Sequence, residues 1–201
     1  MARPRRSEQT REALIEEGIR QLAAHGYHGT GIKQILDAVR VPKGSFYNYF
    51  DSKETFVAEI VRAYSEQGLG QLDAYLNSGK TLSALDKLKA IYHYILEQHA
   101  DVGQTQRGCL IGSLAAEIGS SSVVCQHALI EACRGWQHRL TELFREAQQA
   151  HQVRDDLSPD EMATLFWSAW EGSLLRMKME GSVQAPQRML SLLLDKVFKH
   201  E

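Results

Sequence analysis

The chain has 201 residues, of which 43% are hydrophobic and 24% are charged, and its formal net charge is −2. This composition is typical of a globular protein long enough to bury a core, and it excludes collagen-like and disordered classes. No run approaches the roughly 18 apolar residues of a membrane span, and no apolar segment follows the basic first residues, so we expect a cytoplasmic protein.

Charge distribution and cysteine spacing exclude further classes. Residues 1–55 hold nine Lys or Arg against seven Asp or Glu, which by itself is a weak indication of DNA binding. The three cysteines form no Cys-x-x-Cys pair, and the eight histidines show no His-x-x-x-His spacing. We therefore expect no disulfide framework, no metal site and no cofactor, and these counts disfavour an enzyme.

The first part of the chain has the pattern of a helix-turn-helix. Apolar residues recur at helical spacing over residues 10–24, and His25-Gly26 ends that helix. A short helix is predicted over residues 32–38, with Thr30 as its N-cap. After a short turn, Pro42 begins another short helix, because a first helical turn tolerates the missing N–H of proline. Helix, short turn and helix within about 20 residues define the motif.

A longer helix is predicted next, from the candidate N-cap Ser52 to about Leu76, because apolar residues continue at helical spacing. No segment rich in Ser or Pro separates it from what precedes or follows. We therefore place the domain boundary within this helix, between residues 1–55 and 56–201.

The rest of the chain also has helical periodicity. Helices are predicted over residues 82–98, 123–151, 158–180 and 184–198, with a less regular stretch over 101–122. No segment alternates with period two, so we expect no sheet. The fold class is all-α.

One segment carries a specific resemblance. Residues 41–54 contain the run Lys43-Gly44-Ser45-Phe46-Tyr47, then Tyr49-Phe50 and Ser52-Lys53-Glu54. This run resembles the DNA-binding domain of the TetR/AcrR family of bacterial transcriptional regulators. The resemblance implies an N-terminal three-helix DNA-binding domain over 1–55 and a helical-bundle domain for ligand binding and dimerisation over 56–201.

The residue types in this segment suit the major groove, where a slim first turn lets the chain approach DNA. Lys43, Tyr47 and Asn48 are candidates for base contacts, and Tyr49 and Lys53 for phosphate contacts. Lys33 either touches the DNA backbone or is a solvated charge. The predicted DNA-binding residues are Lys33, Pro42, Lys43, Gly44, Ser45, Tyr47, Asn48, Tyr49 and Lys53.

Two other groups at the start of the chain have predicted places. Phe46 and Phe50 are expected in the small core with Leu14, Ile35 and Leu36. Arg3, Arg5 and Arg6 form a basic arm that either lies along a groove or stays free in solution.

The family resemblance implies a homodimer built from the last two predicted helices. The sequence agrees, because large and small residues alternate along residues 165–177, and a second apolar stripe follows over 190–198. We assign the interface to these helices and not to individual residues.

The segment Arg107-Gly108-Cys109-Leu110 bears on the effector. Cys109 lies near a predicted helix start and two residues from a cation, and both features favour a reactive thiolate. The alternative is a buried, inert cysteine. The Gly-Cys-Leu element is similar to that of TetR-type regulators that respond to N-ethylmaleimide and other electrophiles. The longer segment, with residues 136–139 and 166–172, looks similar to acrylate-responsive members.

A small unsaturated acid or an electrophile fits both resemblances. A carboxylate would need a cation or polar donors within an apolar pocket. The candidate ligand and sensor residues are Cys109, Arg107, His138 and Arg176, with Trp136, Trp167 and Trp170 as pocket walls; the alternative for each is a surface or packing role.

The sequence thus predicts a ligand-responsive repressor that binds a palindromic operator as a dimer and is released by a small unsaturated acid or an electrophile, with Cys109 as the candidate sensor. The partners are double-stranded operator DNA, the effector and a second copy of the chain. The alternative is a TetR-type activator, or a regulator with an unrelated hydrophobic ligand, in which Cys109 only packs.

Overall fold

The computed structural model describes residues 3–77, 82–99 and 108–200, and it confirms the all-α class. The α-helices are α1 (Arg3–His25), α2 (Ile32–Val39), α3 (Lys53–Leu76), α4 (Ala84–His99), α5 (Leu110–Ile118), α6 (Val123–Gln149), α7 (Pro159–Glu180) and α8 (Gln184–Leu192). A 3-10 helix, η1 (Lys43–Asn48), and a π-helix, η2 (Leu193–Val197), complete the elements. Within these ranges, pairing of extended residues is limited to one bridge between Val153 and Lys199.

The chain divides into two compact units. Unit one contains residues 1–67 and 109–132, and unit two contains residues 68–108 and 133–201. Helices α3 and α6 each contribute residues to both units. The predicted domain boundary after residue 55 separates a DNA-binding part from a ligand-binding part, and it stays a prediction. Within the described ranges, every helix is too short or too polar to cross a bilayer.

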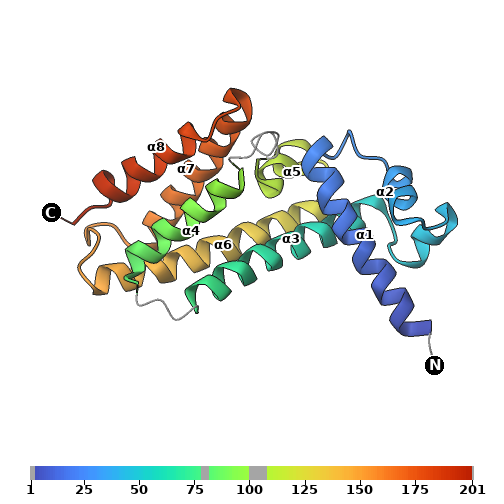
Figure 1. Ribbon diagram of the computed structural model, residues 1–201, viewed down its shortest axis with the longest axis horizontal. Helices are drawn as coiled ribbons and strands as arrows, with labels where there is room; N and C mark the ends of the chain where they lie inside the picture. The colour runs from blue at the N-terminus through green and yellow to red at the C-terminus, as the bar shows by residue number, and fades with distance from the viewer. Residues whose placement is uncertain (1–2, 78–81, 100–107, 201) are drawn as a thin grey trace. The chain divides into compact units, whose positions relative to one another are not determined.

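The core of unit one is built from apolar residues of α1, α2, η1, α3, α5 and the first part of α6; Figure 1 labels these helices except η1. Phe46 and Phe50 are buried, as predicted, with Leu14, Ile35 and Leu36. Their rings also meet Phe56 of α3, at centroid distances of 5.4 and 4.5 Å. These edge and tilted aromatic contacts attach the helix-turn-helix to the start of α3.

Helix α5 packs against the start of the chain although it lies far along the sequence. Its Glu117 carboxylate accepts a hydrogen bond from the backbone N–H of His28, at 3.1 Å. Gly26 beside it has a φ of +70°, a left-handed conformation that favours glycine, and a Cβ there would lie 2.3 Å from the same carboxylate. The predicted end of the first helix at His25-Gly26 is therefore confirmed.

Two local predictions need correction. Helix α1 begins at Arg3, so the backbone of the predicted basic arm, residues 3–6, belongs to that helix. Thr30 does not cap α2, because Gly31 is the N-cap and the Gln34 side chain accepts its N–H. The buried Thr30 hydroxyl donates instead to the carbonyls of Gln21 and Gly26. It therefore fastens the turn to α1.

The two helix starts predicted next, at Ser52 and Pro42, have different outcomes. The Ser52 hydroxyl accepts the N–H of Thr55 at 3.0 Å, so Ser52 caps α3 as predicted. Pro42 stands directly before η1 as its N-cap rather than within its first turn. The predicted short helix is therefore a 3-10 turn, and it ends where Tyr49 and Phe50 both donate to the Phe46 carbonyl.

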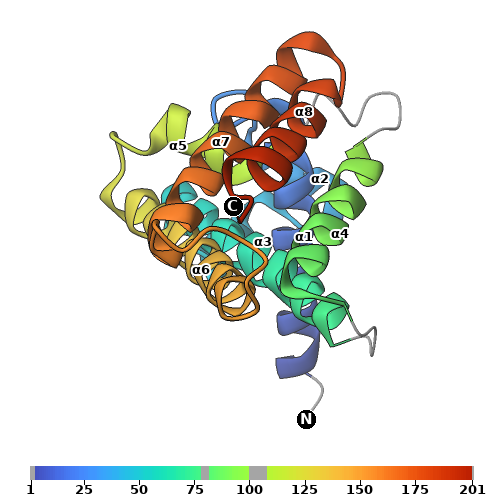
Figure 2. The ribbon, with the colours of Figure 1, turned by 90° about the vertical axis from the view of Figure 1, so that its left-hand side faces the viewer.

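Unit two is a bundle in which α7 and α8 run side by side, as Figures 1 and 2 both show. Helix α7 begins with Ser158, whose hydroxyl accepts the Glu161 N–H, while the Glu161 carboxylate accepts the Ser158 N–H. It ends at Gly181, which has a φ of +62°. A capping box and a left-handed glycine thus define both ends.

Candidate DNA interface and effector site

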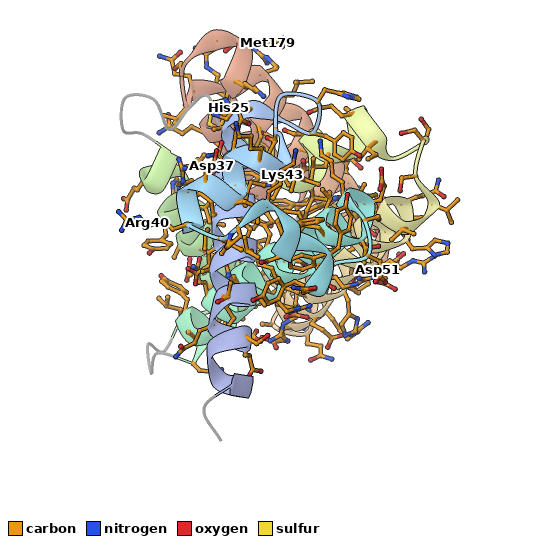
Figure 3. The ribbon with its side chains drawn as sticks, turned by 90° about the vertical axis from the view of Figure 1, so that its right-hand side faces the viewer. His25, Asp37, Arg40, Lys43, Asp51 and Met179 are labelled. Carbon is orange, nitrogen blue, oxygen red and sulfur yellow. The ribbon has the colours of Figure 1, made fainter. Side chains whose placement is uncertain are left out.

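Element η1 separates buried from exposed residues within one turn. Phe46 is 1% exposed, whereas its neighbour Tyr47 is 70% exposed and meets the Phe46 ring edge-on at 5.4 Å. Lys43 and Asn48 are also exposed. Figure 3 looks onto this face, with Lys43 near its middle. The turn therefore presents a cation, a phenol and an amide to solvent on a buried aromatic base.

The remaining predicted residues of this segment complete the surface. Pro42 and Gly44 are exposed, and Ser45 and Tyr49 are half-buried. A Cβ on Gly44 would meet nothing within 4 Å, so packing inside the protein does not require glycine there. A glycine at this place instead lets another molecule approach the backbone closely.

Two exposed cations precede η1 in the chain, one on α2 and one at its C-cap. Lys33 is exposed, as expected of either of its predicted roles. Arg40, directly after α2, is also exposed and was missed by the sequence analysis; Figure 3 labels it to the left of Asp37 and Lys43. Its φ of 59° at the C-cap of α2 turns the chain toward η1. The sequence does not reveal which arginine adopts a left-handed conformation. The place of Arg40 in the short turn before η1 was the one signal that could have suggested it as a DNA contact.

Lys53 is held within the protein. Its ammonium donates to the carbonyls of Tyr27 and Thr30, at 2.9 and 2.7 Å, and lies 4.1 Å from the centroid of the Tyr27 ring. Burial lowers the pKa of Lys53 from its ordinary value. The residue predicted to contact phosphate therefore also braces the turn between α1 and α2.

Tyr27 continues this network. Its hydroxyl donates to the Glu54 carboxylate at 3.1 Å. Burial, followed by this hydrogen bond, raises the pKa of Tyr27 to about 12. On the other side of Glu54, the Cys125 thiol donates to the Glu54 carbonyl at 3.4 Å, and burial raises the pKa of that thiol. Cys125 is thus a structural thiol.

Cys109 stands at a helix N-terminus, as predicted. It is the N-cap of α5 and is half-buried, and Gly108 before it has a φ of +55°. Peptide dipoles at a helix N-terminus stabilise a thiolate. The predicted neighbouring cation, Arg107, lies outside the described residues.

The predicted aromatic walls separate into two contacts in unit two. Trp136 of α6 stacks on Trp167 of α7, with centroids 6.0 Å apart and planes inclined by 18°. Trp170 packs instead against Tyr92 of α4, at 4.5 Å and 75°. The structure therefore brings Trp136 and Trp167 together in one cluster.

Three residues of this cluster were not predicted. The Trp167 indole N–H donates to the Cys133 sulfur, and burial, followed by the Glu171 carboxylate, raises the pKa of Cys133. Gly68 of α3 lies directly against the Trp136 ring. The one sequence signal for this contact was a glycine within a long helical pattern. Glycine lowers helix stability, so its presence there suggests that close packing requires it.

The two other predicted ligand-binding cations lie at the surface. His138 is exposed, and Arg176 is exposed and donates to Glu180 on its own helix at 2.7 Å. Their predicted role in holding a carboxylate thus has no geometric support. Over the described ranges, no three His, Cys, Asp or Glu side chains group as metal ligands would.

Comparison with known families places both halves of the chain. Residues 14–60 match the family described as "Bacterial regulatory proteins, tetR family". Residues 84–193 match the family described as "Tetracyclin repressor-like, C-terminal domain".

Similar proteins cover most of the chain. Transcriptional regulator AcuR of Cereibacter sphaeroides is 39% identical over 84% of this chain and 76% of its own length. The transcriptional repressor NemR of Escherichia coli is 32% identical over 90% of each chain. The transcriptional repressor DhaR of a Mycobacterium species is 28% identical over 92% of this chain and 90% of its own.

Solved structures agree with these matches. The regulatory protein TetR from Rhodobacter sphaeroides superposes with a TM-score of 0.83 at 36% identity, covering 92% of this chain and 96% of the other. The reduced form of Escherichia coli NemR superposes with a TM-score of 0.84 at 28% identity, covering 93% and 96%. The chain belongs to the TetR family of bacterial regulatory proteins and is a transcriptional regulator with a helix-turn-helix DNA-binding domain.

Proposed function

We propose that the protein is a repressor that binds a palindromic operator as a homodimer and leaves it when a small effector binds. The single observation that carries the proposal is η1, which exposes Lys43, Tyr47 and Asn48 on a fully buried aromatic base. Relatives named as repressors, NemR and DhaR, support the direction of regulation. DNA binding would take place in the bacterial cytoplasm.

On DNA, η1 enters the major groove. Lys43, Tyr47 and Asn48 contact base edges, and the exposed Pro42 and Gly44 with Ser45 allow the close approach. Tyr49 and Lys33 contact phosphates, and Arg40 joins them on the same face. Lys53 keeps one N–H beyond its two carbonyl contacts, so its proposed phosphate contact is compatible with its bracing role.

The dimer interface is proposed on α7, with α8 beside it. A stripe of exposed residues follows one face of α7 at helical spacing: Leu165, Ser168, Gly172, Leu175 and Met179. Leu175 and Met179 are 61% and 70% exposed, and a Cβ on Gly172 would meet nothing within 4 Å. Exposed large apolar residues beside small ones suit close packing of two identical helices about a two-fold axis.

The effector is proposed to be a small unsaturated acid or an electrophile. The stacked rings of Trp136 and Trp167 form one wall of its site, consistent with a planar ligand. Cys109, at the N-terminus of α5, is the proposed position of thiol modification. The solved structure of Escherichia coli NemR is described as a reduced form, and we take this as support for a redox-sensitive residue in the present chain.

Release is proposed to act through α3. This helix begins beside the helix-turn-helix core at Lys53 and ends at Leu76 in unit two. An effector that binds better to one position of α3 changes the separation of the two η1 elements in the dimer and weakens operator binding. Only that difference in affinity drives the release.

The test is operator binding measured by fluorescence anisotropy at fixed salt, with DNA from immediately upstream of the protein's own gene. Wild type and Cys109→Ser are titrated with acrylate and then with N-ethylmaleimide. Release of wild type alone identifies a thiol sensor. Equal release of both proteins identifies reversible binding, with Cys109 as a packing residue.

If neither compound releases the wild-type protein, the proposed effector class is wrong and the DNA-binding assignment stands alone. The second candidate function, an activator or a regulator of a different hydrophobic ligand, then takes precedence. The stacked indole rings of Trp136 and Trp167, which are planar and largely apolar, favour that ligand class.

A further inference from the structure

The Trp136 side chain connects the proposed effector site to α3. A Cβ on Gly68 would lie 2.6 Å from Cζ2 and 3.2 Å from Cη2 of the Trp136 ring. The six-membered edge of the indole therefore rests directly on the α3 backbone, in space that no other residue type leaves open. The opposite wall of this contact is the near-parallel ring of Trp167.

The polar atom of the same ring is buried without a partner. Among the described residues, no acceptor lies within hydrogen-bond distance of Trp136 Nε1, although the atom is shielded from solvent. Trp167 differs, because its own N–H donates to the Cys133 sulfur. Buried indole N–H groups normally have an acceptor, since a donor lost from water and left unmatched destabilises the protein.

We propose, building on the proposed function, that Trp136 is the residue through which the effector acts on α3. Its indole N–H donates to an oxygen of the effector, supplied by a carboxylate or by an uncharged carbonyl. The ring moves when this bond forms, and the motion reaches the α3 backbone at Gly68.

The packing explains why such a movement is transmitted. A glycine has no side chain that can rotate away, so a shift of the Trp136 ring meets backbone atoms. Helix α3 continues without a break from Gly68 back to Lys53, whose ammonium holds the turn between α1 and α2. A small displacement at the ring thus reaches the residues that support η1.

The donor role is tested with Trp136→Phe, which keeps an aromatic ring and removes the N–H. We expect the probe concentration for half-release from operator DNA to rise about threefold to tenfold. The probes are acrylate, which carries a carboxylate, and acrylamide, which is uncharged and has a similar shape. The control is Tyr94→Phe, which also removes one aromatic donor, from a half-exposed ring on α4.

The two probes identify the source of the oxygen. If Trp136→Phe loses sensitivity to acrylate alone, the acceptor is a carboxylate oxygen. If it loses sensitivity to acrylamide alone, the acceptor is an uncharged carbonyl oxygen. If it loses sensitivity to both probes, the N–H binds the carbonyl oxygen that the two compounds have in common. If Trp136→Phe responds to both probes as wild type does, the proposed hydrogen bond to the effector is absent and the donor role is overturned.

The coupling role is tested without any effector. Gly68→Ala places a Cβ against the Trp136 ring, and we expect about fivefold weaker operator binding or more. Gly70→Ala on the same helix is the matched control, because its Cβ meets nothing within 4 Å. The double variant Gly68→Ala/Trp136→Phe removes the atoms that collide, so it should bind the operator within about twofold of Trp136→Phe alone.

Operator binding by Gly68→Ala equal to that of Gly70→Ala overturns the coupling role. Operator binding by the double variant that is as weak as that of Gly68→Ala also overturns the coupling role. If Gly68→Ala alone does not fold, the comparison of the double variant with Trp136→Phe decides whether the coupling exists. If neither probe releases wild type, the effector class and the donor role are both wrong. The Gly68 comparison then decides separately whether the ring controls α3.

Discussion

At the scale of single residues, adjacent aromatic side chains in η1 have opposite roles. Phe46 lies in the core with Phe56, whereas Tyr47 stands almost entirely in solvent. The buried ring fixes the turn, and the exposed ring is held by an edge-on contact with it. Within this aromatic run, the buried phenylalanines support the turn, and the exposed Tyr47 is available for contact with DNA.

Substitution of the exposed residues should affect DNA binding alone. We expect Tyr47→Ala to weaken operator binding by about 1–3 kcal/mol and to leave the thermal unfolding midpoint unchanged, because the side chain packs little. Anisotropy and thermal melts measure both quantities. Tyr94→Ala is the control, since its ring is 50% exposed on α4. Equal operator affinity of Tyr47→Ala and wild type would remove Tyr47 from the interface.

Lys43 allows a further distinction between base and phosphate contacts. If Lys43 contacts a phosphate, Lys43→Ala should lower the magnitude of the slope of log affinity against log salt concentration by about 1. A base contact instead lowers affinity for the operator more than affinity for unrelated DNA. Binding of both DNAs unchanged at every salt concentration would contradict either role.

Tyr27 predicts how stability depends on alkaline pH. Its pKa is about 12 in the folded protein, above the ordinary value of about 10 in the unfolded chain, so the folded state holds the phenol proton more tightly. This stabilisation is complete below pH 10 and is lost as pH rises toward 12.

The measurement is denaturant unfolding from pH 8 to pH 11 for wild type and Tyr27→Phe. The free energy of unfolding of wild type should fall more steeply above pH 10. Identical slopes for the two proteins would show that Tyr27 keeps an ordinary pKa when folded.

At the scale of elements, the ends of helices are determined by a few side chains. Helix α7 has a reciprocal capping box at Ser158 and Glu161, with Pro159 at its first position. Helix α3 has the simpler Ser52 cap. Of these two caps the sequence predicted Ser52, whereas Thr30 was a false signal because its hydroxyl bonds to the carbonyls of Gln21 and Gly26.

Loss of the α7 cap should destabilise unit two. We expect Ser158→Ala to lower the free energy of unfolding by about 1 kcal/mol, because the Glu161 N–H loses its acceptor and the Glu161 carboxylate loses the Ser158 hydroxyl. Thr164→Ala on the exposed face of the same helix is the control, and it should leave stability unchanged or slightly raised. Denaturant unfolding by circular dichroism compares the two; equal midpoints would show that the cap contributes nothing.

At the scale of the whole molecule, the proposed dimer determines whether the protein binds a palindrome. Leu175→Glu places a charge in the middle of the exposed α7 stripe, and we expect it to give monomers with operator affinity lowered at least about tenfold. Sedimentation velocity and anisotropy measure these effects. Val123→Glu, at a 68% exposed site on α6 outside the stripe, is the control. A Leu175→Glu protein that remains dimeric would place the interface elsewhere.

The sequence by itself determined the helical class, the order of the helices and the family. These follow from apolar periodicity, from turn residues such as Gly26, and from the run between Lys43 and Glu54, all of which are local signals. Cys109 was placed correctly at a helix start for the same reason.

Only the tertiary structure decided which side chains meet. Lys53, whose phosphate contact stays a prediction, also holds carbonyls of the α1–α2 turn, and Trp136 rests on Gly68 of another helix. Three similar tryptophans likewise divide into a stack with an unpartnered N–H and a separate contact with Tyr92. Such contacts join residues far apart in the chain, and they depend on how whole helices pack, which no local pattern encodes.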